Sequence, residues 1–230
     1  MNIIITGNRK GIGRFLTETY LEKGHFIFGC SRNETDLVHL NYHHFTLDVS
    51  DENSVKSMFS EIRKMGKPID VLINNAGLAA MNHSILTPII TLDNLFKTNF
   101  YGTFIFSREV SKMMKKANYG RIINFSTVAV PLNLEGESIY ASTKSAVETL
   151  TKIMAKEVAE MGITINAVAP TPVPTDLIKT IPKNKIDLLI NQQSIKRIGE
   201  YNDVLNVVDF FIKPESSFIT GQIIYLGGIN

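Results

Sequence analysis

A tyrosine and a lysine four residues apart are the side chains in this sequence that could most readily do chemistry together. Tyr140 and Lys144 lie within Tyr-Ala-Ser-Thr-Lys, so on a helix they project from neighbouring positions on one face. An ammonium group beside a phenol stabilises the phenolate and lowers the phenol pKa from its ordinary value of about 10. The pair could then act as a general acid and base at neutral pH. Tyrosine and lysine also occur at this spacing on ordinary amphipathic helices, so the catalytic interpretation depends on other motifs in the chain.

A glycine-rich turn near the start of the chain could hold phosphate groups. Gly7, Gly11 and Gly13 follow an apolar run at residues 2–6 and precede a helical pattern that continues to Gly24. Bare backbone at such a turn can approach a pyrophosphate and directs a helix N-terminus at its charge. The spacing Gly-x-x-x-Gly-x-Gly differs from the common Gly-x-Gly-x-x-Gly pattern. A tight turn that needs positive φ would explain any single glycine equally well.

Strand-like and helical patterns alternate along the chain. Strands are predicted at residues 2–6, 25–30, 45–47, 71–73, 121–125, 164–168 and 222–226. Helices are predicted after the glycine turn, at about 55–66, at about 92–117 with an interruption near Asn99 and Gly102, from about 140, and at 201–212. This alternation predicts an open parallel sheet covered on both faces. Ligands bind such sheets beyond the carboxyl ends of the strands, where the sequence places Gly7, Asp48, Asn75, Ser126 and Pro170.

Composition narrows the class of protein. The 230 residues include 44% hydrophobic side chains, enough for a substantial core, and we expect one domain over residues 1–230. The net charge of +2 is spread without a basic cluster, so nucleic acid is not an expected partner. The single cysteine, Cys30, and the absence of a signal-peptide pattern predict a cytoplasmic protein. No apolar run is long enough to cross a bilayer and the histidines lack metal-ligand spacing, so neither membrane nor metal is expected.

Several motifs occur together in a fixed order. They are Thr6-Gly7-x-x-x-Gly11-Ile12-Gly13, Asn74-Asn75-Ala76-Gly77, Ser126 and Tyr140-x-x-x-Lys144, followed by Asn166-Ala167-Val168-Ala169-Pro170, Ile219-Thr220-Gly221-Gln222 and Gly227-Gly228. In this combination the sequence resembles the short-chain dehydrogenase/reductase family over essentially its whole length. The resemblance implies an α/β fold: a single-domain, Rossmann-type, doubly wound parallel sheet with helices on both faces. It also favours the catalytic interpretation of Tyr140 and Lys144.

The resemblance assigns roles to four residues of a catalytic site. Tyr140 would supply a proton to a carbonyl oxygen during hydride transfer, and Lys144 would lower the phenol pKa and bind the nicotinamide ribose. Ser126 would donate a hydrogen bond to the same oxygen as charge develops on it. Asn99 would hold a water that connects the lysine to solvent. A helix kink or cap is the alternative for Asn99.

The resemblance also implies a cofactor site built from several segments. Its predicted members are Thr6, Gly7, Arg9, Lys10, Gly11, Ile12, Gly13, Arg32, Asp48, Val49, Asn75, Ala76, Gly77, Tyr140, Lys144, Pro170, Val173 and Thr175. Thr6 would tie the glycine turn to the sheet, Asp48 would hold the adenine amino group, and residues 75–77 would pass beside the adenosine ribose. Val173 and Thr175 would meet the nicotinamide carboxamide and the phosphates, although Thr171 replaces the glycine that usually follows the proline.

The turn after the second strand decides between the two nicotinamide cofactors. In the NAD-dependent pattern an acidic residue there binds the ribose 2′-hydroxyl, whereas a 2′-phosphate needs a cation. This strand ends Gly29-Cys30-Ser31-Arg32 without an acid, and Arg32 can form a fork with phosphate oxygens. Lys10 stands where relatives that use NADP carry a basic residue. We therefore predict NADP(H); the alternative is that both cations are merely solvated.

The predicted function is interconversion of a ketone and a secondary alcohol, with the substrate left open. The pattern is similar to that of 3-oxoacyl-[acyl-carrier-protein] reductases, but Asn118 and Met161 stand where those enzymes carry cations that meet the acidic carrier. The expected pocket wall, residues 78–81 and 128–137, mixes apolar groups with Glu135 and Glu137. Glu135 could bind hydroxyls of a sugar-like or polyol substrate, or it could be a solvated loop carboxylate. Residues 177–194 are expected to form a mobile lid with a helical piece.

Two further questions stay open at this point. A binding module that keeps the fold and cofactor as a redox sensor or scaffold is the alternative to an enzyme. Family members commonly form homotetramers or homodimers through the helices that contain Asn99 and Tyr140. Phe104, Phe106 and Val147 fit such an interface and fit a core equally well.

Overall fold

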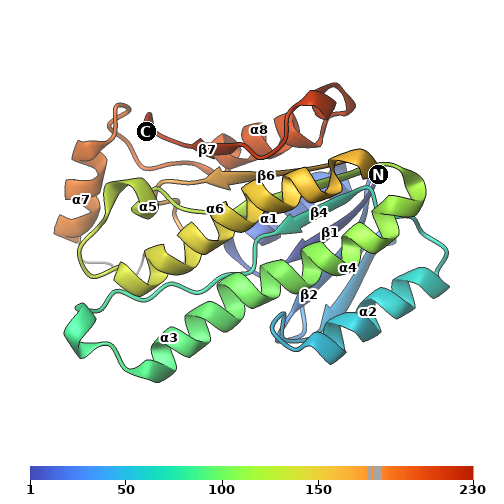
Figure 1. Ribbon diagram of the computed structural model, residues 1–230, viewed down its shortest axis with the longest axis horizontal. Coiled ribbons are helices and arrows are strands. Elements are labelled where there is room, and N and C mark those ends of the chain that lie inside the picture. Colours follow the sequence, from blue (N-terminus) through green and yellow to red (C-terminus); the bar gives the residue numbers. More distant parts are fainter. Residues whose placement is uncertain (176–177, 179–182, 230) are drawn as a thin grey trace.

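One parallel sheet organises the computed structural model, which describes residues 1–175, 178 and 183–229. Its seven strands follow the order β3-β2-β1-β4-β5-β6-β7, and each neighbouring pair is parallel (Figure 1). The strands are β1 (Asn2–Thr6), β2 (Phe26–Ser31), β3 (Tyr42–Thr46), β4 (Val71–Asn74), β5 (Gly120–Phe125), β6 (Ile163–Ala169) and β7 (Ile223–Tyr225). The strand order reverses at β1, which lies between β2 and β4. A ligand crevice is therefore expected at the carboxyl ends of these strands.

Helices connect the strands and cover both faces of the sheet. The α-helices are α1 (Gly11–Glu22), α2 (Glu52–Lys64), α3 (Ile89–Phe96), α4 (Gly102–Ala117), α5 (Ala129–Leu132), α6 (Ser138–Val158), α7 (Lys183–Gln192) and α8 (Tyr201–Ile212). Short 3₁₀ turns lie at Ser84–Leu86, Ala159–Met161 and Pro214–Phe218, and a π-helical turn at Lys97–Tyr101 joins α3 to α4. The long helices α4 and α6 lie side by side on one face (Figure 1).

Alternate side chains of the strands enter two apolar cores, one on each face. Ile4 packs in the core formed with α2, α4 and α6, whereas Ile3 and Ile5 pack in the core formed with α1 and α8. Successive strand residues point to opposite faces, so a strand covered on both sides must be apolar throughout. A fully buried side chain of this size contributes about 1.5–3 kcal/mol. The predicted doubly wound α/β fold is confirmed.

The helix expected over residues 92–117 is divided as the sequence indicated. The π-helical turn contains Asn99, and Gly102 begins α4. The third strand begins at Tyr42, earlier than predicted. The sequence did not indicate this start, because Tyr42 and His44 share a face that makes polar contacts and therefore lacks the apolar pattern of a strand. Helix α7 supplies the helical piece expected within residues 177–194, whereas residues 177 and 179–182 of that segment lie outside the described residues.

Two of the three apolar residues that could belong either to a subunit interface or to the core lie in the core. Phe106 and Val147 are completely buried in the monomer and belong to its interior, whereas Phe104 on α4 is partly exposed.

None of the described helices is both long and apolar enough to cross a membrane.

Candidate active site

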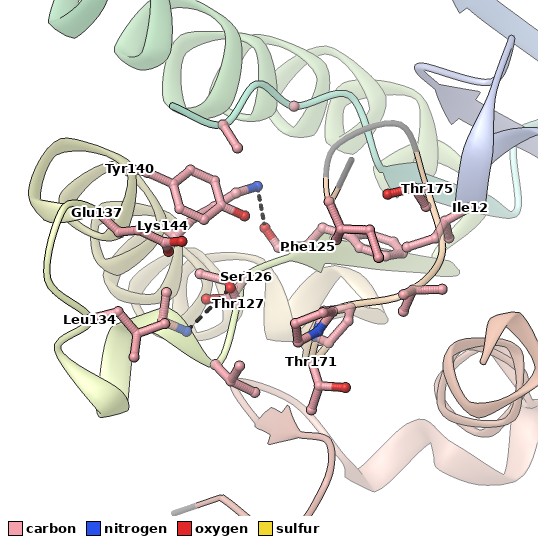
Figure 2. Close-up of a pocket in the computed structure, with 18 of the residues that line it drawn as sticks. Ile12, Phe125, Ser126, Thr127, Leu134, Glu137, Tyr140, Lys144, Thr171 and Thr175 are labelled. Carbon is pink, nitrogen blue, oxygen red and sulfur yellow. Dashed lines mark hydrogen bonds between the residues drawn. The ribbon is translucent and has the colours of Figure 1, made fainter. Parts of the chain in front are cut away.

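A cavity lies beyond the carboxyl ends of β4, β5 and β6, and the first turns of α6 form one of its walls (Figure 2). The lining residues are Ile12, Asn75, Gly77, Leu78, Ala79, Phe125, Ser126, Thr127, Val128, Ala129, Leu134, Glu137, Tyr140, Lys144, Pro170, Thr171, Pro172, Val173, Thr175, Ile178 and Leu189. The cavity thus brings together nine of the twenty residues that were predicted for the two sites. Its wall is mostly apolar, and two of its polar side chains, Thr127 and Glu137, influence the pKa of Tyr140.

The tyrosine and the lysine enter this cavity from consecutive turns of α6. Their spacing places both on the helix face that the sequence analysis predicted. Lys144 Nζ donates a hydrogen bond to the Phe125 carbonyl oxygen at 2.9 Å, which anchors α6 to the end of β5. A Cβ built on Gly77 would lie 3.5 Å from Lys144 Nζ, so the ammonium group also lies close to the β4 end.

Burial changes the acidity of these two groups in opposite directions. Loss of hydration disfavours the charged form of each group, and it lowers the pKa of Lys144 to about 8. Burial raises the pKa of Tyr140 to about 12; a hydrogen bond with Thr127 opposes this change and the Glu137 carboxylate adds to it. The net shift of the Tyr140 pKa is therefore upward, whereas the sequence predicted a downward shift. Desolvation dominates at Tyr140, and the ammonium group is directed at the Phe125 carbonyl oxygen.

Two adjacent residues that carry hydroxyl groups follow β5, and their hydroxyls have different partners. Ser126 Oγ donates to Glu148 Oε1 at 2.5 Å, and Tyr225 OH donates to Glu148 Oε2 at 2.8 Å. Thr127 lies close enough to Tyr140 to oppose the rise of the phenol pKa through hydrogen bonding, and its hydroxyl accepts a hydrogen bond from the Ala129 N–H at 3.2 Å. The structure thus engages the Ser126 hydroxyl elsewhere and places Thr127, which the sequence analysis missed, beside the phenol.

The Asn99 side chain fastens the π-helical turn to the wall of the cavity. Its Oδ1 accepts from the Leu78 N–H at 2.8 Å, and its Nδ2 donates to the Leu78 carbonyl oxygen at 2.9 Å and to Thr143 Oγ1 at 3.0 Å. The Asn99 carbonyl oxygen accepts from the Thr103 hydroxyl at 2.7 Å. The residue therefore connects the segment after β4 with α6. The irregular turn proposed as the alternative is present, and π-helical turns are frequent at functional sites.

The glycine turn is held against the end of β4. The Ala76 N–H donates to Thr6 Oγ1 at 3.0 Å, as expected for the residue that ties the turn to the sheet. Asn75 Nδ2 donates to the carbonyl oxygens of Thr6 and Gly7, both at 3.0 Å. Gly13 must lack a side chain because its Cβ would collide with the Asn75 amide and the Gly7 carbonyl.

The backbone of the turn itself has the conformation that glycine favours. Gly7 and Gly11 have φ of 67° and 55°, in the left-handed region. Lys10 is the exposed N-cap residue of α1, and Arg9 is half-buried in the turn. A Cβ on Gly11 would lie 3.2 Å from Thr175 Cγ2, so the turn faces the segment after β6. Bare backbone in front of a helix N-terminus fits a pyrophosphate group.

A second cavity lies on the other side of the glycine turn. It is lined by Ser31, Arg32, Leu47, Asp48, Val49, Ala76, Gly77, Leu78 and Thr98. It therefore gathers most of the residues assigned to the adenosine end, although Asn75 lines the first cavity instead; Gly77 and Leu78 line both cavities. Asp48 Oδ1 accepts from the N–H and the hydroxyl of Ser50 at 2.8 and 2.7 Å, which fixes its carboxylate at the rim.

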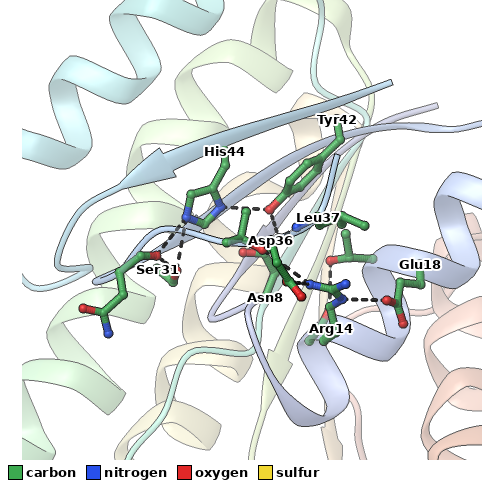
Figure 3. Close-up of polar contacts among 12 residues, drawn as sticks. Asn8, Arg14, Glu18, Ser31, Asp36, Leu37, Tyr42 and His44 are labelled. Atoms are coloured by element: carbon green, nitrogen blue, oxygen red, sulfur yellow. Dashed lines mark hydrogen bonds and ion pairs between the residues drawn. The ribbon is translucent and has the colours of Figure 1, made fainter. Parts of the chain in front are cut away.

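A chain of polar contacts that no sequence motif indicated supports the glycine turn (Figure 3). Asn8 Nδ2 donates to the Tyr42 hydroxyl at 2.7 Å, and that hydroxyl lies 2.8 Å from His44 Nδ1. His44 Nε2 lies 3.1 Å from the Asn33 carbonyl oxygen. The chain links the turn to the loop that follows Arg32. Gly29 makes room for it, because a Cβ there would collide with the Asn8 amide.

The two glutamates of the predicted pocket wall have different surroundings. The Glu135 side chain is 93% exposed and lies 3.6 Å from Lys185 Nζ, so the solvated alternative holds for this residue. Glu137 is only 9% exposed and lines the cavity with Tyr140. Within the described part of the chain, no group of three or more histidine, cysteine or carboxylate residues is arranged to hold a metal ion.

Comparison with known proteins finds reductases and dehydrogenases. The family model described as enoyl-(acyl carrier protein) reductase matches residues 6–229. The 3-oxoacyl-[acyl-carrier-protein] reductase FabG of Escherichia coli strain K12 is 29% identical over 98% of this chain and 95% of its own length. ElxO with NADP bound has 30% identity and a TM-score of 0.89 over 98% of this chain and 96% of that chain. 4-Hydroxyisoleucine dehydrogenase complexed with NADH has 25% identity and a TM-score of 0.88 over 100% of this chain and 98% of that chain.

Replacement of Asn99 by alanine is expected to destabilise the protein, because it leaves the half-buried N–H and carbonyl groups of Leu78 without their hydrogen-bond partners. A buried polar group left unpaired costs about 1–3 kcal/mol, and because these groups are half-buried, the free energy of unfolding should fall by an amount near the lower end of that range. Equilibrium urea denaturation measures the change. Asn94→Ala, an exposed position on α3, is the matched control. Equal stability of the two variants would show that the Asn99 side chain does not hold the wall.

Proposed function

Because the chain belongs to the short-chain dehydrogenase/reductase family, we propose that it interconverts a ketone and a secondary alcohol with NADP(H) as hydride carrier. Family membership makes it an oxidoreductase of CH–OH and C=O groups. The observation that supports this reaction most directly is the meeting of Tyr140, Lys144 and Thr127 in one cavity that reaches the glycine turn. A redox sensor or scaffold would have no chemical need for this set of groups.

Reduction of a ketone needs one proton at the carbonyl oxygen, and Tyr140 is the proposed donor. When bound, the nicotinamide cofactor supplies the hydride to the carbonyl carbon. The Tyr140 phenol, with a pKa of about 12, holds its proton at neutral pH until charge develops on the carbonyl oxygen. Below a pH of about 8 the Lys144 ammonium remains charged in the same cavity and stabilises the tyrosinate left by the transfer.

Thr127 is the proposed hydrogen-bond donor to the carbonyl oxygen, in place of Ser126. Its hydroxyl already contacts the phenol, so an oxygen that meets Tyr140 lies within reach of both groups. The Ser126 hydroxyl instead donates to Glu148, and this bond holds the start of the Ser126–Thr127 segment against α6. A preorganised donor at a developing oxyanion contributes about 10²–10³ in kcat.

The cofactor is proposed to lie across the carboxyl ends of β1, β2 and β4. The turn at Gly7 and Gly11 would hold the pyrophosphate, and Asp48 with Val49 would hold the adenine. Exposed Arg32 would pair with the 2′-phosphate. Because one structural relative binds NADP and another binds NADH, the choice of NADP(H) depends on Arg32 and on the lack of an acid at the end of β2.

Similarity to FabG favours a second candidate, reduction of a 3-oxoacyl chain on an acyl carrier protein. Asn118 and Met161 are less suited to an acidic carrier than cations would be. The Asn118 carbonyl approaches Gly162, so both positions lie in one surface region, next to exposed Lys115 and Lys116. Turnover of a carrier-bound oxoacyl thioester well above that of the coenzyme A thioester would favour this candidate over a free small carbonyl.

The outer faces of α4 and α6 carry exposed apolar residues that could pair with a second copy of the chain. We propose a homodimer or homotetramer formed through the outer faces of α4 and α6, where Phe104 and Ile153 are exposed. A cytoplasmic location is consistent with Cys30, whose thiol is free and buried in the core.

The catalytic proposal is tested by Thr127→Val, which removes the hydroxyl with little change in shape. We expect kcat/KM to fall about 10²–10³-fold. Activity is measured at the NADPH absorbance band with a panel of ketones, oxo-thioesters and keto-sugars. Tyr140→Phe should abolish turnover while NADPH binding, followed by fluorescence, stays nearly intact. Ser126→Ala is the matched control and should lose less than Thr127→Val; the reverse order would return the donor role to Ser126. NADPH binding without turnover across the panel would favour the sensor.

The pH dependence of ketone reduction should follow Lys144. The Lys144 pKa is lowered to about 8, so its charge is complete well below pH 8 and is lost as the pH rises through that value. Tyr140 stays protonated to about pH 12 and does not limit the rate in this range. We expect kcat/KM with NADPH to fall about tenfold per pH unit above pH 8. A rate that is constant from about pH 6 to 10 would contradict the role of this ammonium group.

Replacement of Arg32 by aspartate should shift the preference from NADPH towards NADH. The carboxylate would repel a 2′-phosphate and could accept hydrogen bonds from a 2′-hydroxyl. We expect NADPH to bind about 10–100-fold more weakly, as for the loss of one charge-assisted hydrogen bond. Arg63→Asp, at an exposed position on α2, is the control for the change in net charge. An unchanged NADPH/NADH ratio in Arg32→Asp would contradict the choice of cofactor.

A further inference from the structure

A buried carboxylate in the active-site cavity has no described partner. Glu137 is 9% exposed, precedes α6 as its N-cap residue and lines the same cavity as Tyr140 and Thr127. Figure 2 shows its side chain beside Tyr140, with the carboxylate directed towards the cavity. The side chain does not cap the helix. Within residues 1–175, 178 and 183–229, no donor makes a hydrogen bond or ion pair with this carboxylate, and burial alone raises its pKa.

The other buried glutamates of the protein are satisfied. Glu109 pairs with Arg108 and Lys112 at 2.8 and 2.7 Å, and Glu148 accepts from Ser126 and Tyr225 at 2.5 and 2.8 Å. A carboxylate removed from water is strongly destabilising unless donors replace the lost hydration. Glu137 therefore differs from the buried carboxylates that hold the fold together. A ligand group that donates to it would supply the missing hydrogen bond.

The position of Glu137 relative to Tyr140 limits what that ligand can be. Residues three apart at the start of a helix project from neighbouring positions, with Cβ atoms about 5–6 Å apart. A substrate whose carbonyl oxygen meets Tyr140 would therefore present a donor to Glu137 from a carbon next to the reacting carbon, or one beyond it. Elsewhere the wall is largely apolar, with Leu78, Val128, Leu134 and Leu189.

We propose that Glu137 is a specificity-determining residue that accepts a hydrogen bond from a substrate hydroxyl group adjacent to the reacting carbonyl. The substrate is then a hydroxy ketone, or the corresponding diol in the reverse direction, rather than a simple ketone. This inference rests on the proposed function and deepens it by naming the substrate class. A cationic donor such as an ammonium group is disfavoured, because Lys144 lines the same cavity and would repel it.

Glu137 differs in its solvation from Glu135, the other carboxylate of the expected pocket wall. Glu135 lies two residues earlier, but its side chain is solvated and close to Lys185. A solvated carboxylate gains little from a substrate hydroxyl, because it exchanges one water hydrogen bond for another. A desolvated carboxylate discriminates strongly, because an analogue without the hydroxyl leaves it unpaired. Glu135→Gln is therefore a matched control for substitutions at Glu137.

The test compares substrates that differ only in the hydroxyl group: acetoin with butanone, and hydroxyacetone with acetone. In the wild-type protein we expect kcat/KM with NADPH to be at least about a hundredfold higher for the hydroxy ketones. Glu137→Leu should reduce this preference to less than about tenfold, whereas Glu137→Gln, whose amide oxygen can still accept, should keep part of it. Glu135→Gln should keep the full preference. An unchanged preference in Glu137→Leu would overturn the proposal, as would wild-type turnover of butanone equal to that of acetoin.

A binding measurement separates failure of this inference from failure of the proposed function. In the Tyr140→Phe background, the NADPH complex is titrated with acetoin, butanone and aminoacetone, and cofactor fluorescence is recorded. Tighter binding of acetoin than butanone, lost in Tyr140→Phe/Glu137→Leu, supports the hydroxyl site whether or not the wild type turns these ketones over. Equal binding of acetoin and butanone overturns the hydroxyl site, and tighter binding of aminoacetone replaces the hydroxyl with a cation. Absence of wild-type turnover for every ketone counts against the proposed function alone.

Thermal unfolding adds a readout that a structural role would move in the opposite direction. If Glu137 is kept for a substrate, removal of its unpaired carboxylate should raise the unfolding midpoint of Glu137→Leu. Glu148→Leu, which breaks two existing hydrogen bonds, should lower it. A lowered midpoint in Glu137→Leu together with an unchanged substrate preference would assign Glu137 to the fold and overturn the proposal.

Discussion

The fastening of the carboxyl end of β1 to that of β4 is the constraint on which the rest of the structure depends. Here the strand order reverses, the chain leaves the two strands in different directions, and their last peptide groups lose the partners of the ladder. The Asn75 amide and the Thr6 hydroxyl satisfy these groups across the gap. Because Gly13 has no side chain, the first turn of α1 can pack directly on this junction. The junction separates the two cavities, and Gly77 lines both.

The chemistry of the larger cavity depends on desolvation. Tyr140 and Lys144 both shift towards their neutral forms, which is the effect of removing charged groups from water. Elsewhere in the fold, the buried carboxylates of Glu109 and Glu148 have ion-pair or hydrogen-bond partners. Ionisable groups that are buried without such compensation are typical of functional sites, where stability is given up for reactivity or recognition. The cavity therefore brings three ionisable groups with raised or lowered pKa values, Glu137, Tyr140 and Lys144, together at the carboxyl ends of the strands.

The candidate site was predictable where its members are close in sequence, and much less so where two neighbours compete for one role. Tyr140 and Lys144 meet because four residues on a helix bring any two side chains to one face. Ser126 and Thr127 are chemically equivalent candidates at the end of β5, but their side chains leave the chain in different directions. Only the position of α6 decides that the first hydroxyl meets Glu148 and the second meets Tyr140. Glu135 and Glu137 are likewise equivalent in sequence, and the path of the loop before α6 leaves the first carboxylate in solvent and buries the second.

The sequence by itself determined the elements, their parallel arrangement and the rim on which ligands bind, because periodicity, glycine turns and strand apolarity are local properties. It also determined the family, because the order and spacing of the motifs can be read along the chain without knowledge of the structure. Tertiary structure decided the direction of the Tyr140 pKa shift and the Asn8–Tyr42–His44 contacts. It also decided which of two adjacent hydroxyls or carboxylates is buried. These properties are sums over atoms from distant segments: desolvation and hydrogen bonding depend on everything within a few ångströms, and no local pattern records that neighbourhood.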